Sequence, residues 1–274
     1  MALGRARAFF RDRATPAGVV ARRLLGRATA ADEELADHLV RERRRRSRMD
    51  GSINGSLVDT ARAAWELLDL GALADHAGVV RLTGFLLGRQ DAPGRWGELT
   101  GLGDGFFSPG PVDQSIAPLT LTAGVVLEHE NDARFAASCI ALRAILRAGF
   151  DERTRVRTHV DALIGMSGLA PTLEVLVLGT VGLASPDYAA RVNELAESLV
   201  GRQNDDGTWA GVPLCHALEA LSTIPTPAAR EGVRRAAAPL LTMQAESGSF
   251  DEGDSEQLAL IAVRALVTAR SMLA

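Results

Sequence analysis

The sequence contains no lysine, because all 30 of its basic residues are arginine. This excludes enzymes that form a Schiff base on a lysine amine and nucleotide sites that need a P-loop lysine. Cysteine is almost as scarce, with only Cys139 and Cys215 in the chain. Two cysteines are too few for a disulfide scaffold, so we expect a reducing, cytoplasmic environment.

Aromatic residues and long apolar runs are also scarce. Phe, Trp and Tyr make up 4% of the 274 residues. No uncharged apolar run reaches the ~18 residues that indicate a membrane-spanning helix. The start of the chain lacks the apolar core of a secretory signal. Strand patterns are missing as well, so the sequence predicts an all-α protein.

Most segments have the periodicity of helices. The segments 112–130, 169–184 and 254–270 are apolar on nearly all sides, which predicts buried helices, whereas 188–203 and 231–244 have one polar face. Ser56 with Asp59, and Asp254 with Gln257, have the spacing of capping boxes at two helix starts. Buried and amphipathic helices that alternate in this way predict a helical repeat fold.

Three turns between these helices share a Gln, then a Gly, then an aromatic residue. They are Gln90/Gly94/Trp96, Gln203/Gly207/Trp209 and Gln244/Gly248/Phe250. The pattern resembles the QW motif of terpene cyclases and the related turn of protein prenyltransferase β subunits, over about residues 50–272. The resemblance implies an α/α toroid at residues 50–274, preceded by a basic helical N-terminal extension at residues 1–49. We interpret the motif residues as structural, since Gln can bind backbone groups at a helix end and Gly permits a tight reversal.

The resemblance also implies where catalysis would occur, at the start of a buried helix. Class II terpene cyclases carry an acid there that protonates an alkene, and Asp254 takes that position, with Asp251 and Glu252 beside it. The alternative is that Asp254 is only an N-cap, which stabilises a helix by about 1 kcal/mol. Asp59, Cys215 and His216 precede or begin other helices and are the candidate substrate-binding residues.

No metal or cofactor is expected. The Asp–x–Cys zinc motif of protein prenyltransferases is missing, and Cys215–His216 with the distant Cys139 is the one thiol-containing set left for zinc. Cys215 is equally explained as a small core residue.

Positive charge is concentrated at the N-terminal end of the chain. Residues 1–50 hold 13 Arg and 7 Asp or Glu, a net charge of +6. The arginine run at 41–48 lacks interleaved aromatic residues for base stacking, so no nucleic acid partner is expected. The run is either a solvated helix face or a contact for a membrane surface or a protein. In residues 5–27, the apolar side chains of Phe9, Phe10, Val19 and Leu24 would lie on a membrane or dock on the toroid.

Two functions follow from these patterns. The first is an isoprenoid-active toroid, a protonation-initiated cyclase acting on a short or singly cyclised substrate and holding an apolar isoprenoid-like molecule. The alternative is a non-catalytic toroid that binds lipid, a peripheral membrane surface or a protein partner as an assembly subunit.

Overall fold

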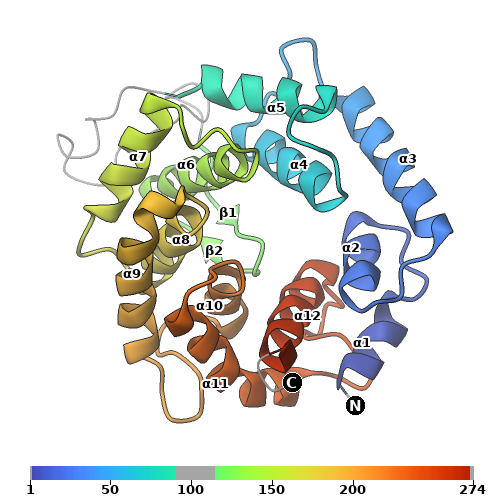
Figure 1. Ribbon diagram of the computed structural model, residues 1–274, viewed down its shortest axis with the longest axis vertical. Coiled ribbons are helices and arrows are strands. Elements are labelled where there is room, and N and C mark those ends of the chain that lie inside the picture. Colours follow the sequence, from blue (N-terminus) through green and yellow to red (C-terminus); the bar gives the residue numbers. More distant parts are fainter. Residues whose placement is uncertain (1, 91–114, 272–274) are drawn as a thin grey trace. The chain divides into compact units, whose positions relative to one another are not determined.

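The computed structural model describes residues 2–90 and 115–271. These residues form twelve α-helices, one short 3-10 helix and a two-stranded hairpin, so the predicted all-α class is confirmed (Figure 1). Within the described residues, no helix has both the length and the apolar character needed to cross a membrane. The elements are α1 (Ala2–Phe10), α2 (Pro16–Leu24), α3 (Ala30–Arg46), α4 (Leu57–Asp69), α5 (Ala77–Gly88), β1 (Leu119–Thr120), β2 (Val126–Leu127), α6 (Glu130–Arg147), α7 (Thr154–Ile164), α8 (Pro171–Val181), η1 (Pro186–Tyr188), α9 (Ala189–Gly201), α10 (Leu214–Leu221), α11 (Pro227–Met243) and α12 (Glu256–Ser271).

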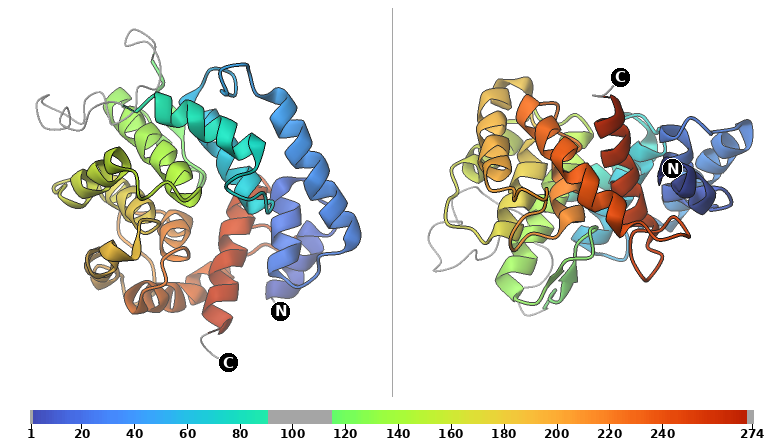
Figure 2. Two further views of the ribbon diagram at one scale, coloured as in Figure 1. Left: turned by 45° about the horizontal axis from the view of Figure 1, so that its top comes forward. Right: turned by 90° about the horizontal axis from the view of Figure 1, so that it is seen from below.

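The chain divides into two compact units. Unit 1 contains Met1–Asp37, Thr122–Val125 and Tyr188–Ala274, and unit 2 contains His38–Leu121 and Val126–Asp187. In unit 1, α12 packs against both α1 and α2, and this neighbourhood is visible from two directions in Figure 2. The units therefore follow other boundaries than the predicted division at residue 49, because the first helices of the chain share a core with the last one.

Buried and amphipathic helices alternate as the sequence predicts. In unit 1, α10 buries six of its eight residues and α12 eight of 16, whereas α9 buries four of 13 and α11 five of 17. In unit 2, α8 buries eight of its 11 residues and α7 buries four of 11. The fully buried helices supply the core of each unit, because apolar surface on every side must be covered by neighbours.

The predicted helix at residues 112–130 is wrong over its described part. Strands β1 and β2 form an antiparallel hairpin there, and α6 begins only at Glu130. Pro118 has no N–H to donate to a helix, and Gly124 has a φ of +79° at the hairpin tip. The Glu130 carboxylate accepts backbone N–H groups from Ile116 and Ala117 at 3.0 Å each, which fixes the chain entering the hairpin.

One of the two predicted helix caps is observed at the predicted residue, and the other lies one residue later than predicted. The Ser56 hydroxyl accepts the backbone N–H of Asp59 at 3.1 Å, so Ser56 caps α4 as predicted. At α12 the cap is Ser255, whose Oγ accepts the backbone N–H of Leu258 at 3.3 Å. Asp254 lies one residue before this cap.

The turn at 203–209 joins α9 to α10 and also holds α11. Gln203 donates from Nε2 to the carbonyl oxygens of Gly207 at 2.8 Å and of Gly232 on α11 at 3.0 Å. Arg235, one helical turn further along α11, donates back to the Gln203 carbonyl at 3.1 Å. Gly207 has a φ of +86°, and a Cβ there would lie 2.2 Å from the Arg235 carbonyl oxygen. Glycine is therefore required both by the backbone angle and by the approach of α11.

The turn at 244–250 repeats this arrangement with α1 as the partner. Gln244 donates from Nε2 to the carbonyl of Ala2 at 3.1 Å, and Arg5 donates to the Gln244 carbonyl at 3.3 Å. Gly248 has a φ of +92°, and its Cβ would lie 2.3 Å from the Arg5 carbonyl oxygen. Helix α1 therefore contacts the last turn as α11 contacts the one before it.

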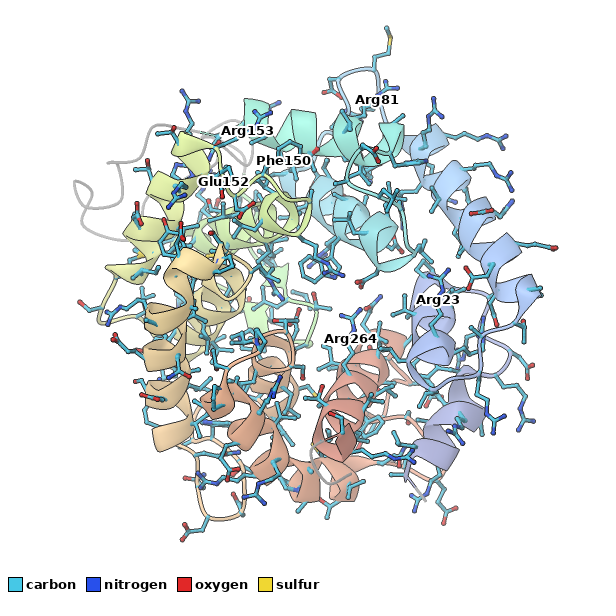
Figure 3. The ribbon with its side chains drawn as sticks, viewed as in Figure 1. Arg23, Arg81, Phe150, Glu152, Arg153 and Arg264 are labelled. Carbon is cyan, nitrogen blue, oxygen red and sulfur yellow. The ribbon has the colours of Figure 1, made fainter. Side chains whose placement is uncertain are left out.

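A third turn of this kind lies at 47–53 in unit 2. The Gln–Gly–aromatic pattern does not predict it, because Ser47 and Ile53 replace the Gln and the aromatic residue. Gly51 has a φ of +90°, and its Cβ would lie 2.4 Å from the carbonyl oxygen of Arg81 on α5. The Arg81 guanidinium donates to the Arg48 carbonyl at 2.6 Å (Figure 3). We call the turns at 47–53, 203–209 and 244–250 the clasped turns.

The turn that begins at Gln90 shares part of this arrangement. Arg155 on α7 donates to the Gln90 carbonyl at 3.3 Å, and the Gln90 Nε2 lies 2.9 Å from Nδ1 of His159. Gly94 and Trp96, the other two residues of that predicted motif, lie outside the described residues.

Candidate functional site

The loop before α12 carries the three predicted catalytic carboxylates, in unit 1. Asp251 is half-buried, and its Oδ1 accepts the backbone N–H of Ser255 at 2.8 Å. Glu252 and Asp254 are exposed, and Asp254 has a φ of +50°. The three are consecutive in one loop, but only Asp251 is held by a hydrogen bond at the helix start.

Cys215 and His216 lie in the first turn of α10 and are buried at 4% and 2% exposure. Burial, together with the negative charges of Asp251 and Glu219, raises the pKa of the Cys215 thiol to about 11. The structure thus brings Cys215 close to one of the predicted catalytic carboxylates. A thiol with a raised pKa is a poor nucleophile near neutral pH, so the setting suits a core residue.

The other candidates do not join this cluster. Asp59 belongs to unit 2, where its Oδ2 accepts the side-chain amide of Asn54 at 3.2 Å near the start of α4. Cys139, also in unit 2, is fully buried, and burial raises the pKa of its thiol to about 12. In the part of the chain that the structure describes, no three His, Cys, Asp or Glu side chains are grouped as metal ligands.

Glu256, which the sequence search did not select, ties α12 to the N-terminal helices. Its carboxylate accepts the Thr15 hydroxyl and forms an ion pair with Arg13 at 3.3 Å. Thr15 also caps α2, since its Oγ1 accepts the backbone N–H of Gly18 at 3.1 Å. The position of Glu256 at the start of a helix can be read from the sequence. Its partners Arg13 and Thr15 cannot, because they are more than 240 residues away.

The apolar residues near the N-terminus lie in the core of unit 1. Phe9, Phe10 and Val19 are 8%, 0% and 0% exposed, and of the four apolar residues selected here only Leu24 reaches 38%. Of the two predicted roles for these side chains, docking on the rest of the protein is the one observed.

Exposed arginines gather instead at the C-terminal end of α3, in unit 2. Arg41, Arg44 and Arg45 are spaced i, i+3 and i+4, which places them on one side of the helix, and Arg48 follows in the turn after it. We call these four residues the basic face. Their neighbours Arg43 and Arg46 are ion-paired with Glu66 and Glu42. Among the described residues, no ion pair involves Arg41, Arg44 or Arg45.

The clasped turn at 47–53 extends the basic face with an apolar residue. Met49 is 97% exposed, the most exposed of the large hydrophobic side chains in the described residues. Asp50 next to it accepts the backbone N–H and hydroxyl of Ser52, and these hydrogen bonds, aided by Arg48 and Arg89, lower the pKa of its carboxyl. Asp50 is therefore an ionised part of the turn, held by internal hydrogen bonds.

Comparison with protein-family models and with curated protein sequences identifies no relative of the chain. No protein-family model matches the chain, and no curated protein sequence matches it either.

Proposed function

We propose that this protein is an α/α toroid that acts as a docking subunit and binds an anionic partner through the basic face. The observation that carries the proposal is the arrangement of Arg41, Arg44 and Arg45, which are exposed on one side of α3 without an ion pair among the described residues. Unpaired charges of one sign on a rigid helix attract an oppositely charged surface and set the rate and salt dependence of association.

The toroid is supported by the clasped turns. The same Gly–Arg contact recurs in both units, and for the turns 47–53 and 203–209 it joins the turn to the second helix after it. At the turn 244–250, α1 takes that place. A repeat in which the first helix follows the last is the pattern expected of a closed ring of helices.

The experiment that tests the docking function measures binding of the whole chain to heparin, a soluble polyanion, over a range of salt concentrations. We expect binding that weakens as salt rises, because salt screens exposed charges. The triple variant Arg41→Gln/Arg44→Gln/Arg45→Gln should bind about a hundredfold more weakly, at roughly 1 kcal/mol for each charge.

The matched control changes three exposed arginines elsewhere, Arg11→Gln/Arg27→Gln/Arg230→Gln, and alters the net charge by the same amount. This variant should keep most of the affinity. Equal losses in both variants would show that net charge alone drives binding, and the proposed docking surface would be wrong.

A second candidate is the protonation-initiated cyclase that acts on a short isoprenoid. One observation favours it: the acidic loop 251–254 leads into a buried helix, next to buried Cys215. Asp254 itself is exposed to water, whereas an acid that protonates an alkene works best in a dry setting. Asp251, half-buried and fixed by Ser255, is the better placed acid.

The cyclase is tested by mass spectrometry of products after incubation with farnesyl diphosphate, geranylgeranyl diphosphate or squalene. A cyclic product that disappears in Asp251→Asn and persists in Glu252→Gln would establish the cyclase and place its acid. If no substrate is consumed by the folded protein, this candidate is rejected.

A further inference from the structure

We infer that the anionic partner of the basic face is a lipid bilayer, into which Met49 inserts while the arginines bind the headgroups. This inference rests on the proposed docking function and names its partner. It is drawn from the combination of an exposed apolar residue on a fixed turn and the exposed arginines at the end of α3, which leads into that turn.

The first step is the exposure of Met49. Burying a methionine side chain away from water is favourable, yet this one is 97% exposed. The turn offers it no cover, because the backbone is fixed by the Arg48 N–H to Ser52 carbonyl bond of 2.8 Å and by the contact of Gly51 with Arg81. Met49 is therefore held away from the protein by a well-defined backbone.

The second step compares Met49 with the corresponding residues of the other clasped turns. The bonds match in order: Asn204 N–H to Thr208 carbonyl at 2.8 Å in the turn 203–209, and Ala245 N–H to Ser249 carbonyl at 3.0 Å in the turn 244–250. By this alignment the tip residues are Asp205 and Glu246, both exposed acids. The turn itself does not need an apolar tip, so methionine at this position has another reason.

The third step is charge. The tip follows directly on Arg48, and Arg44 and Arg45 precede it on the same side of α3. An exposed apolar side chain next to a set of arginines fits the interface of an anionic membrane, where the cations meet phosphate or carboxylate headgroups and the apolar group enters the acyl boundary. Such a bilayer presents anionic groups and an apolar interior side by side, so one surface takes up both the arginines and Met49.

The test is co-sedimentation of the full chain with vesicles of phosphatidylcholine and phosphatidylserine, with phosphatidylcholine vesicles as the neutral comparison. Heparin binding is measured on the same samples. We expect binding to the anionic vesicles only, reduced about a hundredfold in the Arg41→Gln/Arg44→Gln/Arg45→Gln variant.

Met49→Gln isolates the insertion, because it removes the apolar side chain without changing the charge, and the exposed tip should tolerate it. We expect this variant to lose at least about tenfold in vesicle binding and much less in heparin binding. Glu246→Met places a methionine on a clasped turn without the basic face, and should gain no vesicle binding. Far-ultraviolet circular dichroism verifies that each variant is folded.

The outcomes separate the two proposals. Heparin binding without binding to anionic vesicles would overturn the membrane inference and leave the docking function in place, with a soluble acidic protein or nucleic acid as the partner. If the unmodified chain binds neither heparin nor anionic vesicles, both the docking function and the membrane inference are overturned. Equal vesicle binding by Met49→Gln and the unmodified chain would contradict the insertion of Met49 and therefore the inference.

Discussion

A methyl group on Gly207 would meet the carbonyl oxygen of Arg235 at 2.2 Å, whereas one on Gly211 would meet nothing within 4 Å. Both glycines have a positive φ, +86° and +73°. The pair therefore separates two costs of an added side chain, the strain of the backbone angle and the collision with a neighbouring helix.

We expect Gly211→Ala to lower the free energy of unfolding by about 1 kcal/mol, from backbone strain alone. Gly207→Ala should cost at least about 3 kcal/mol, because α11 must move away as well. Urea denaturation followed by circular dichroism measures both. Similar values for the two variants would mean that α11 is not held against this turn.

The two cysteines provide a prediction on reactivity and pH. Their pKa values are raised to about 12 and about 11 by burial. At neutral pH both thiols should resist a thiol reagent such as dithionitrobenzoate in the folded protein and react after unfolding.

The raised pKa values of the two thiols also determine the direction in which stability changes with pH. In the unfolded chain the thiols ionise near 9.0, the ordinary value, while the folded protein keeps them protonated. The folded state therefore binds more protons between about pH 9 and pH 11, and the stability should fall across that range. The double variant Cys139→Ala/Cys215→Ala should show a smaller fall, and an unchanged slope would contradict the prediction.

At the scale of single elements, α1 is a core helix of unit 1. Its Phe10 is fully buried, and Leu24 on α2 is a nearby apolar residue that is 38% exposed. We expect Phe10→Ala to cost about 3–5 kcal/mol, and Leu24→Ala less than about 1 kcal/mol. Thermal unfolding distinguishes the two. A small effect of Phe10→Ala would mean that α1 detaches from unit 1 in solution.

Helices were the part of the fold that the sequence predicted best. Ser56 and the apolar period after it specify α4 locally, and the structure agrees with both. The failure at 112–130 has a local cause, because an apolar composition outweighed Pro118 and Gly124, which break a helix. The turn at 47–53 was missed for the opposite reason: Gly51 and its partner Arg81 carry the arrangement, and the side chains that usually mark it are replaced.

The sequence predicts the candidate site only where all the residues involved lie in one segment of the chain. Arg41, Arg44 and Arg45 lie within one short segment of α3, so their common face follows from helical spacing. The electrostatic effect of Asp251 on Cys215 and the hydrogen bond between Thr15 and Glu256 join distant segments. No local pattern encodes such pairs, since they depend on which helices pack together.

At the scale of the whole molecule, residues 1–37 group with residues 188–271. This grouping predicts that the N-terminal residues are an integral part of unit 1 and not a removable extension. A chain that begins at residue 50 lacks α1 and α2, and exposes the surfaces of α12 and of the turn 244–250 that they cover. We expect its midpoint of thermal unfolding to fall by roughly 10 °C or more.

A peptide of residues 1–49 added to the truncated chain should restore part of that loss, because its contacts are non-covalent. If the truncated chain unfolds at the same temperature as the full one, residues 1–49 are an extension and residues 50–274 an independent domain.

The contact between Arg5 and Gln244 spans 239 residues, and this separation matters during translation. A ribosome adds about 5–20 residues each second, so α1 waits about 10–50 seconds for the turn that receives it. During that time Phe9 and Phe10 have no core to enter, while unit 2 is already being completed. Nascent chains of this protein therefore carry Phe9 and Phe10 without the surface of α12 during that interval, and a chaperone that binds such segments is expected to act at α1.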